Sequence, residues 1–476
     1  MLRRTKIVAT VGPATDDVQI LTDMMRAGLD VARLNASHGT VDDRRRRLAM
    51  VREAANRANR CVGVLLDLAG PKIRIESFVE GKVMLVEGKP FVLDTALDPK
   101  AGTLESVGVA YKNLIHDVKG GDTLLLNDGQ IVLDVDRVAG TRIHTHVRVG
   151  GELSNRKGLN RQGGGISAPA LSDKDKEDIR VAVEESVDYI AVSFARDADD
   201  IEQARTLARR AGRDTRIVAK VERQEAISNL DAIIKASDVV MVARGDLGVE
   251  MGYAELTGLQ KTIIHKTRAQ NRVVITATQM MESMIQSPIP TRAEASDVAN
   301  AVLDGTDAVM LSAETAAGRY PVRAVEAMAQ IIEGAEKYQV SLGNERHRTE
   351  GQFGDSEEAI AMAVMYAANH MKVRAIVALT ESGSTPLWMS RIRSDIPIYA
   401  FTRHESTRRR VTMFRGVYPV IFDVTRAKST GELYDTLFTR LLELKLVERK
   451  DLVILTKGEQ SGVQGGTNSL QILEVA

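Results

Sequence analysis

Short runs of β-branched and other apolar residues recur along the chain, and most of them end abruptly in charged, hydroxyl or glycine residues. Segments rich in Ala, Leu and Arg lie between many of them, for example 42–60 and 199–212, and predict amphipathic helices. The apolar runs that we predict to be strands span residues 6–11, 31–34, 62–67, 189–194, 217–221, 239–243, 273–276 and 308–311. Eight strands that alternate with helices predict a closed (β/α)8 TIM barrel rather than an open sheet.

The interval between the third and fourth of these strands is too long for a simple connection. It is rich in Val, Gly and Asp, and strand-like runs at 82–86, 123–126 and 131–135 alternate with glycine-containing turns. A structureless loop of this length is implausible within a compact domain. We therefore expect an inserted small β-barrel domain at residues 73–166, with hinges at Gly70-Pro71 and Gly163-Gly164-Gly165.

The pattern changes again after residue 333. A polar stretch at 344–354 is followed by a predicted helix at 357–370 and by predicted strands at 375–380, 396–401, 417–422, 452–455 and 470–475. We expect a separate C-terminal α/β domain of residues 344–476. The barrel would then comprise residues 1–72 and 167–343.

Composition excludes several classes of protein. The chain has 64 Lys and Arg against 64 Asp and Glu, and so lacks the basic excess typical of proteins that bind nucleic acids or membrane surfaces. Its single cysteine excludes an internal disulfide. No run approaches the roughly 20 apolar residues of a membrane span, and no apolar segment follows the N-terminal arginines as in a secretory signal. We expect a cytoplasmic protein.

Charged residues at the ends of two neighbouring predicted strands are the first candidates for chemistry. Lys220 and Glu222 are two residues apart on a strand and share a face, and Asp246 follows the next strand. Two carboxylates suit Mg²⁺, which leaves other ligand positions to water and substrate oxygens. A salt bridge at a strand end explains Lys220 and Glu222 equally well.

Three other strand ends carry polar groups. Arg33, Asn35 and Ser37 alternate after the second strand, where the arginine suits a phosphate and the others offer neutral oxygens, although a polar helix-capping loop is the alternative. The residues after the third strand include Asp67, Lys72 and Arg74, which could equally be incidental charges at a hinge. Thr278 ends the seventh strand and would direct its hydroxyl into the mouth of the barrel.

The C-terminal domain has one candidate site. Thr380-Glu381-Ser382-Gly383-Ser384-Thr385 lies after a predicted strand and before a predicted helix. Small hydroxyls and a glycine at a helix N-terminus can bind an anion, and ordinary helix capping is the alternative. The segment Gly465–Asn468 could form a second loop facing the first.

Taken together and in order, the motifs resemble those of pyruvate kinase along essentially the whole chain. They are VARLNASHG (31–39), NRKGLN (155–160), AKVERQEAI (219–227), VMVARGDLGVE (240–250), TATQMMESM (276–284) and PTRAEASDVANAVLDGTDAVMLSAET (290–315). The resemblance implies transfer of the phosphoryl group of phosphoenolpyruvate to ADP, giving pyruvate and ATP, in the last step of glycolysis. It also implies a homotetramer, with no nucleic-acid or membrane partner.

The resemblance assigns roles residue by residue. Glu222 and Asp246 match the Mg²⁺ ligands, a site that Mn²⁺ could also fill. The residues that match catalytic groups are Lys220, Arg33 and Thr278. Substrate binding falls on Arg33, Ser193, Lys220, Gly245, Asp246 and Thr278, and nucleotide binding on Arg74, Lys157, Asn35 and His38.

Departures from the family pattern concern the monovalent cation. Many members need K⁺, and the matching ligands Asn35, Ser37 and Asp67 are present here. Leu68, however, stands where the family has a threonine, and Lys72 stands where K⁺-dependent members have a glutamate. An ammonium at residue 72 could supply the charge of the cation, so we expect that K⁺ is not required.

The resemblance further implies an allosteric site for a phosphorylated metabolite, for which we expect a sugar monophosphate or AMP. Its residues would be Thr380, Ser382, Gly383, Ser384 and Thr385. The alternative enzyme is a Mg²⁺-dependent enolate lyase or aldolase on the same barrel, which would need neither the insert nor Lys220. A third reading is a sensor with an inactive barrel, which predicts loss of Lys220, Glu222 or Asp246, and all three are present.

Overall fold

The computed structural model describes residues 2–341, 353–458 and 466–476. Eight strands form a closed barrel in the order β1-β16-β15-β14-β13-β12-β3-β2, which confirms the expected fold class. Their bounds are β1 (Lys6–Val11), β2 (Val31–Asn35), β3 (Gly63–Asp67), β12 (Tyr189–Val192), β13 (Arg216–Val221), β14 (Val239–Ala243), β15 (Val273–Ala277) and β16 (Ala308–Leu311). Neighbouring strands such as β1 and β2, or β13 and β14, are parallel.

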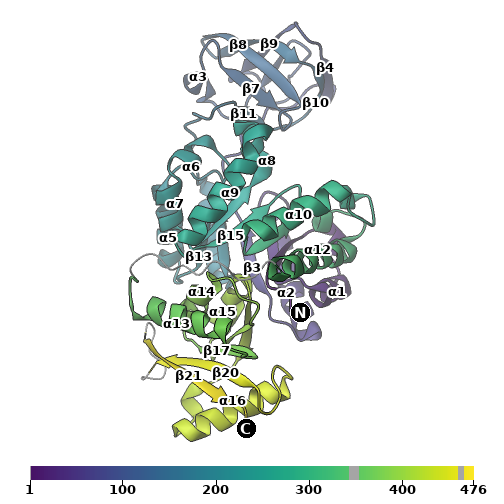
Figure 1. Cartoon of the computed structure of the whole chain (residues 1–476). Coiled ribbons are helices and arrows are strands. Elements are labelled where there is room, and N and C mark those ends of the chain that lie inside the picture. Colours follow the sequence, from purple (N-terminus) through teal and green to yellow (C-terminus); the bar gives the residue numbers. More distant parts are fainter. Residues whose placement is uncertain (1, 342–352, 459–465) are drawn as a thin grey trace. The chain divides into compact units, whose positions relative to one another are not determined.

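Helices follow the strands as the pattern predicts (Figure 1). They are α1 (Val18–Ala27), α2 (Val41–Ala58), α4 (Asp173–Glu184), α5 (Ala198–Arg210), α6 (Gln224–Ser228), α7 (Leu230–Ala236), α8 (Arg244–Met251), α9 (Tyr253–Ala269), α10 (Arg292–Asp304), α11 (Ala313–Ala316) and α12 (Pro321–Ser341). Local sequence fixes several ends. Thr40 and Asp43 form a capping box at the start of α2, and Gly305 ends α10 in the left-handed conformation.

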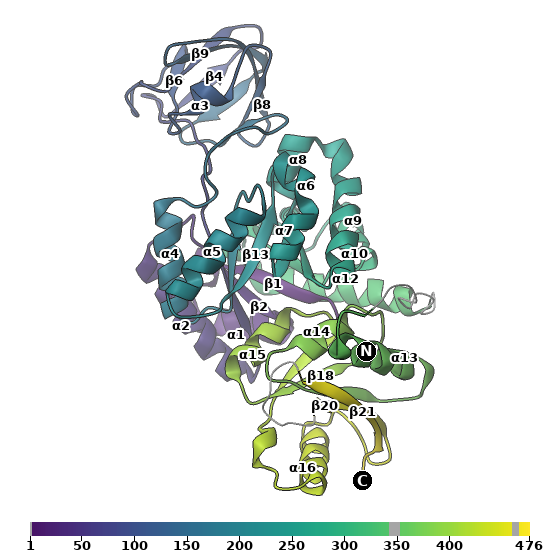
Figure 2. The same ribbon diagram turned by 90° about the vertical axis from the view of Figure 1, so that its left-hand side faces the viewer.

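The residues cluster into two compact units. One contains Met1–Leu66, Glu185–Tyr189 and Thr267–Ala476, and the other contains Asp67–Glu184 and Ile190–Lys266. The second unit holds the strands between β3 and α4. Those that are labelled in Figures 1 and 2 lie together. They form a six-stranded sheet in the order β11-β7-β8-β9-β5-β6 and a two-stranded sheet of β10 and β4.

The bounds of the inserted strands are β4 (Lys82–Leu85), β5 (Pro90–Asp94), β6 (Ser106–Gly108), β7 (Thr123–Leu126), β8 (Ile131–Ala139), β9 (Arg142–Val149), β10 (Gly151–Ser154) and β11 (Leu159–Arg161). A short helix, α3 (Leu114–Asp117), connects two of them. The strands enclose their own core, with Phe91, Leu93 and Leu133 fully buried. A separate core is what an independently folded insert requires.

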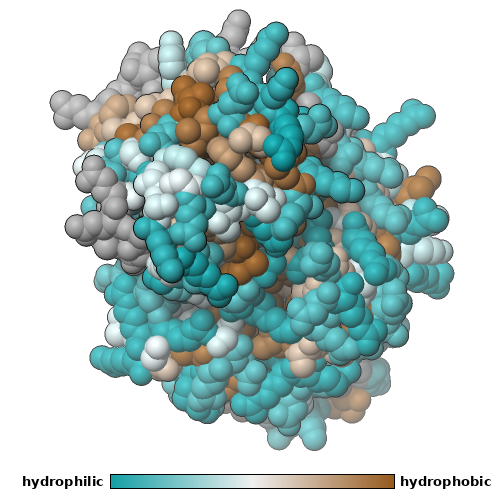
Figure 3. Space-filling view, turned by 90° about the horizontal axis from the view of Figure 1, so that it is seen from below, coloured by the Kyte–Doolittle hydropathy of each residue, from teal (hydrophilic) through white to brown (hydrophobic). Residues whose placement is uncertain are grey.

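The first unit also holds a five-stranded sheet in the order β19-β18-β17-β20-β21. Its strands are β17 (Ala375–Leu379), β18 (Ile398–Thr402), β19 (Val417–Ile421), β20 (Leu452–Gly458) and the antiparallel β21 (Thr467–Glu474). The helices among them are α13 (Ser356–His370), α14 (Ser384–Ser390), α15 (Glu405–Arg410) and α16 (Thr430–Glu443). The expected boundary at 343/344 lies outside the described residues. The face seen in Figure 3 is largely hydrophilic, with small hydrophobic areas scattered over it.

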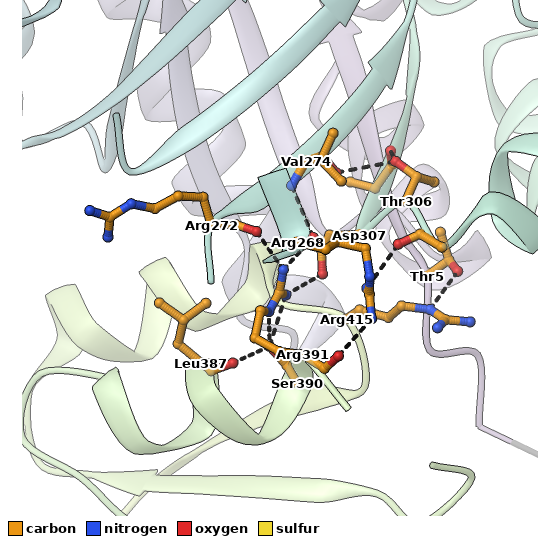
Figure 4. A network of polar contacts seen from close by, with 12 residues as sticks. Thr5, Arg268, Arg272, Val274, Thr306, Asp307, Leu387, Ser390, Arg391 and Arg415 are labelled. Carbon is orange, nitrogen blue, oxygen red and sulfur yellow. Dashed lines mark hydrogen bonds and ion pairs between the residues drawn. The ribbon is translucent and has the colours of Figure 1, made fainter. Parts of the chain in front are cut away.

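A buried ion pair joins this α/β part to the barrel strands of the same unit (Figure 4). Arg391, which follows α14, donates from Nη1 to Oδ2 of Asp307 at 2.9 Å. The same carboxylate accepts the backbone N–H of Val274 at 2.9 Å. Arg268 donates to the carbonyl of Arg391 at 2.7 Å. No helix within the described residues is long and apolar enough to cross a bilayer.

Candidate active site

Lys220 is the centre of a cluster at the end of β13. Its ammonium nitrogen lies 2.7 Å from Ser193 Oγ, 2.8 Å from Glu222 Oε1 and 3.3 Å from Asp67 Oδ1. The Lys220 side chain is 12% exposed, whereas those of Glu222 and Asp67 are almost completely buried. The predicted shared face of Lys220 and Glu222 is present, and so is the salt bridge that was the alternative explanation.

The backbone around Ser193 is shaped to support this cluster. Phe194 has a positive φ of 56° and donates its N–H to Glu222 Oε2 at 2.7 Å. This left-handed residue explains why β12 ends at Val192 instead of continuing to residue 194 as predicted. Such backbone strain in a bulky residue occurs mainly at functional sites.

Asp246 lies in the first turn of α8, immediately after β14. The N-cap residue of this helix, Ala243, makes no side-chain cap hydrogen bond, and Gly245 precedes Asp246. The Asp246 carboxylate lies 3.3 Å from the ammonium of Lys72, which is also 3.8 Å from Asp128. The structure thus pairs Lys72 with a predicted Mg²⁺ ligand, while Asp67 pairs with Lys220.

The carboxylates present here suit a divalent cation. Burial raises the pKa of the Glu222 carboxyl, Lys220 opposes this rise, and the negative charges of Asp246 and Asp67 add to it. Excess negative charge at a buried site is what a cation would relieve. Among the described residues, no group of three or more His, Cys, Asp or Glu side chains is arranged to hold a metal by itself. A pair of carboxylates instead fits Mg²⁺, which binds through few protein ligands.

Arg33 belongs to the other unit, on β2. It is 9% exposed, and its Nη1 donates to Thr10 Oγ1 on the neighbouring β1 at 2.9 Å. Asn35 ends the strand, and its side-chain oxygen accepts the N–H of Ser37 at 3.0 Å. Ser37 and His38 are exposed. The structure therefore gives Asn35 a local role in the turn after β2.

Thr278 follows β15 in this same unit. It has a φ of 67°, and the next residue, Gln279, has a φ of 53°. The Thr278 hydroxyl donates to the carbonyl of Ala277 at 2.6 Å. Two consecutive non-glycine residues in the left-handed region mark this strand end as strained.

The two residues expected to bind nucleotide phosphates lie on facing segments at the edge of the insert. Arg74 forms an isolated antiparallel bridge with Gly158, the residue after Lys157. Its guanidinium donates to the carbonyl of Arg156 at 2.9 Å. The side chains of Arg74 and Lys157 are partly exposed.

The loop expected to bind an effector is held by its own hydroxyls. Thr380 Oγ1 accepts the N–H of Gly383 at 2.9 Å, and Ser384 Oγ donates to Glu357 Oε2 at 2.8 Å. Gly383 has a φ of 90° and caps α14, and Ser382 Oγ lies 3.1 Å from Ser384 Oγ. The hydroxyl oxygens of Thr385 and Thr467 lie 2.7 Å apart and form a hydrogen bond. Gly465 of the second expected loop lies outside the described residues.

Sequence reasoning missed Glu250, a buried carboxylate near the cluster. Its Oε2 accepts the N–H of Gln224 at 3.1 Å, and Asn160 is among the polar groups near it. Burial raises its pKa to about 7. The available signal was its position four residues after Asp246 in VMVARGDLGVE, which is the spacing of neighbours on a helix.

Comparisons with known proteins agree along the chain. A family model described as pyruvate kinase, barrel domain, matches residues 2–325, and one described as pyruvate kinase, alpha/beta domain, matches residues 358–473. Pyruvate kinase II of Salmonella typhimurium is 54% identical, over 100% of this chain and 99% of the relative. The pyruvate kinase of Haemophilus influenzae is 51% identical over 99% of both chains, and that of Buchnera aphidicola from Acyrthosiphon pisum is 50% identical over 100% and 99%.

Proposed function

The chain belongs to the pyruvate kinase family, a group of glycolytic phosphotransferases, and we propose that its residues carry out this reaction as set out here. The phosphoryl group of phosphoenolpyruvate passes to ADP, which gives pyruvate and ATP. The observation that best supports this is the buried cluster of Lys220, Ser193, Asp67 and Glu222. An enolate lyase or aldolase would have no use for this lysine.

Lys220 and Arg33 act on the transferring phosphoryl group. The transition state of phosphoryl transfer is loose and spreads negative charge over the equatorial oxygens, so catalysis depends on positioned positive charge. Lys220 is held by three oxygens and cannot swing away. Arg33 is held by Thr10 and presents a planar guanidinium suited to a phosphate.

Family membership implies dependence on a divalent metal, and we assign Glu222 and Asp246 as its ligands, with Mg²⁺ the ion and Mn²⁺ a substitute. When bound, the ion supplies positive charge that neutralises charge developing on the phosphoryl oxygens. The N–H of Phe194 fixes one oxygen of Glu222, which leaves the carboxylate little freedom to rotate. Ser193, Gly245 and Asp246 complete the substrate contacts.

Thr278 handles the proton that carbon must receive once the phosphoryl group has left. Its strained backbone fixes the direction of its hydroxyl, which reaches substrate directly or through one water. Residues 73–166 serve as a lid that excludes water during transfer. Arg74, Lys157, Asn35 and His38 contact the nucleotide, and the partly exposed guanidinium of Arg74 is available to a phosphate.

K⁺ is not required, because Lys72 contributes a fixed ammonium beside Asp246. Leu68 stands where the family has a threonine whose carbonyl is a cation ligand, and the Leu68 carbonyl already accepts from Ser193 Oγ at 2.8 Å. Asn35, Ser37 and Asp67 are what remains of the cation site in the sequence. The test replaces K⁺ by tetramethylammonium: wild-type turnover should persist, and Lys72→Glu should make turnover depend on K⁺.

A phosphorylated metabolite, a sugar monophosphate or AMP, binds the loop of Thr380, Ser382, Gly383, Ser384 and Thr385. The hydroxyls and the backbone N–H groups of this loop could bind a phosphate once Ser384 is released from Glu357. The domains divide as residues 1–72 with 167–343, 73–166 and 344–476, and four copies assemble in the cytoplasm. Effector titration of Ser382→Ala should show no change in the half-saturation for phosphoenolpyruvate, in contrast to the wild type.

The activity itself is tested with phosphoenolpyruvate, ADP and Mg²⁺, with pyruvate production followed through lactate dehydrogenase. Pyruvate should appear only when ADP is present. Pyruvate formed without ADP would support the lyase alternative, and no turnover under any condition would contradict both.

A further inference from the structure

Two of the three residues that follow Glu222 form hydrogen bonds with the segment that leaves the insert. Arg223, 4% exposed, donates to the carbonyl of Ile166, and Glu225 accepts the N–H of Gly165. Gly164 and Gly165 have φ values of 71° and 89°. A Cβ at Gly164 would meet Glu225 at 2.9 Å. The exit hinge thus runs directly against the chain that carries a proposed metal ligand.

Glu250 connects the turn after Glu222 to α8, the helix that carries the other proposed metal ligand, Asp246. It lies one turn after Asp246 in α8 and is 5% exposed. Its carboxylate accepts the N–H of Gln224, the first residue of α6, for which Arg223 provides no side-chain cap. Asn160 of β11 is a polar neighbour of the carboxylate, and the Glu250 carbonyl accepts the N–H of Gly163 at 3.4 Å.

Three segments therefore meet at one residue: the turn after Glu222, which bonds its side chain, the helix that bears Asp246, and the end of the insert, which bonds its carbonyl. Arg223 supplies positive charge nearby, which partly compensates the burial of the Glu250 carboxylate. We propose that Glu250 is a positioning residue for the divalent metal, which sets Glu222 and Asp246 at the separation that the ion needs and ties that separation to the hinge.

This inference rests on the metal ligands assigned under Proposed function. Groups that orient metal ligands typically change metal affinity by about 10- to 100-fold when they are removed. Truncating the Glu250 side chain would free the N-terminus of α6. The two carboxylates would then lose their fixed separation while remaining chemically intact.

The experiment measures Mn²⁺ binding by electron paramagnetic resonance, without substrates, on the full chain. Glu250→Ala should raise the Mn²⁺ dissociation constant about 10- to 100-fold. Glu250→Gln should restore most of the affinity, because an amide oxygen can still accept from Gln224. Glu255→Gln is the matched control, with the same charge change at an exposed position of α9, and should bind as the wild type does.

Steady-state kinetics separate positioning from general damage. In Glu250→Ala the half-saturating Mn²⁺ concentration should rise, while KM for phosphoenolpyruvate at saturating Mn²⁺ should stay within about twofold, because uniform substrate binding is untouched. A folded Glu250→Ala protein with wild-type Mn²⁺ affinity would overturn the proposal. Should that variant not fold, Glu250→Asp decides: it keeps the charge but draws the carboxylate back from the N–H of Gln224. It should weaken Mn²⁺ binding several-fold, and unchanged binding overturns the proposal.

Glu222→Gln distinguishes this inference from the proposal beneath it. If Glu222→Gln binds Mn²⁺ like the wild type, the assigned ligands are wrong. If Glu222→Gln loses Mn²⁺ and Glu250→Ala does not, the ligands stand and only the positioning role fails.

Discussion

The ammonium group of Lys220 is divided among a hydroxyl and two carboxylates, all largely buried. Burial raises the pKa of Glu222, and two carboxylates around one ammonium leave a net negative charge that adds to this rise. In the proposed mechanism the lysine both balances the charge of the site and presents positive charge to substrate. Removing the Lys220 ammonium should lower kcat more than it weakens substrate binding.

Lys220→Met tests this at the level of turnover. We expect kcat to fall by at least about 10²- to 10³-fold, because one preorganised charge is lost from a buried site. Lys220→Arg should not restore it, since a planar guanidinium cannot replace a compact ammonium held by three oxygens. Lys176→Gln, at an exposed position of α4, should leave kcat unchanged in the coupled assay. More than a tenth of wild-type turnover in Lys220→Met would contradict this role.

The pKa of Glu250, raised by burial to about 7, makes stability depend on pH. From its ordinary value of 4.5 up to about 7, the native protein keeps a proton that the unfolded chain has lost. Stability contributed by this group is therefore fully present below 4.5 and is lost as pH rises through 7, by at most about 3 kcal/mol. Glu250→Gln should flatten the decline of the unfolding free energy, measured in urea, between these pH values, and an equal decline in both proteins would contradict the shift.

Among the elements, agreement with the sequence follows local pattern. Strands β1, β14 and β16 have the predicted bounds, and β14 and β16 are apolar runs between polar residues. The end of β12 was missed because the left-handed φ of Phe194 depends on its contact with Glu222, on another strand. Spacing along β13 revealed Lys220 and Glu222. The partners of Glu250 escaped because Asn160 lies on a separate sheet, and no periodicity connects residues so far apart.

Gly70, in the hinge that enters the insert, shows how an element constrains the site. It has a φ of 64°, and a Cβ there would lie 2.7 Å from the Cβ of Ser193. Gly70→Ala should displace Ser193 and with it Lys220, lowering kcat about tenfold or more, as small misplacements do. Gly81→Ala is the control, because Gly81 has a similar φ of 80° but open space around it. It should lose about 1 kcal/mol of stability and no activity. Equal activities in the two variants would show that the contact with Ser193 is unimportant.

At the scale of the whole molecule, a buried ion pair joins the barrel strands of the first unit to its α/β part. Asp307 immediately precedes β16, and its carboxylate reaches Val274 of β15 and Arg391 after α14 (Figure 4). The side chains of Asp307 and Arg391 are 0% and 5% exposed, respectively. An ion pair this deep is little screened by salt, and either partner left alone is costly to bury.

Asp307→Asn and Arg391→Met should each destabilise the protein by about 3–5 kcal/mol, because each leaves the other charge buried and unpaired. The double variant should lose much less than the sum, since it removes both charges together. The measurement is urea unfolding followed by the fluorescence of Trp388, the only tryptophan in the sequence, which lies on α14. Glu405→Gln breaks an exposed pair with Arg408 in the same α/β part and should cost less than about 1 kcal/mol. Additive losses in the double variant would mean that the two residues act independently, and that the sheet is fixed to the barrel by its other contacts.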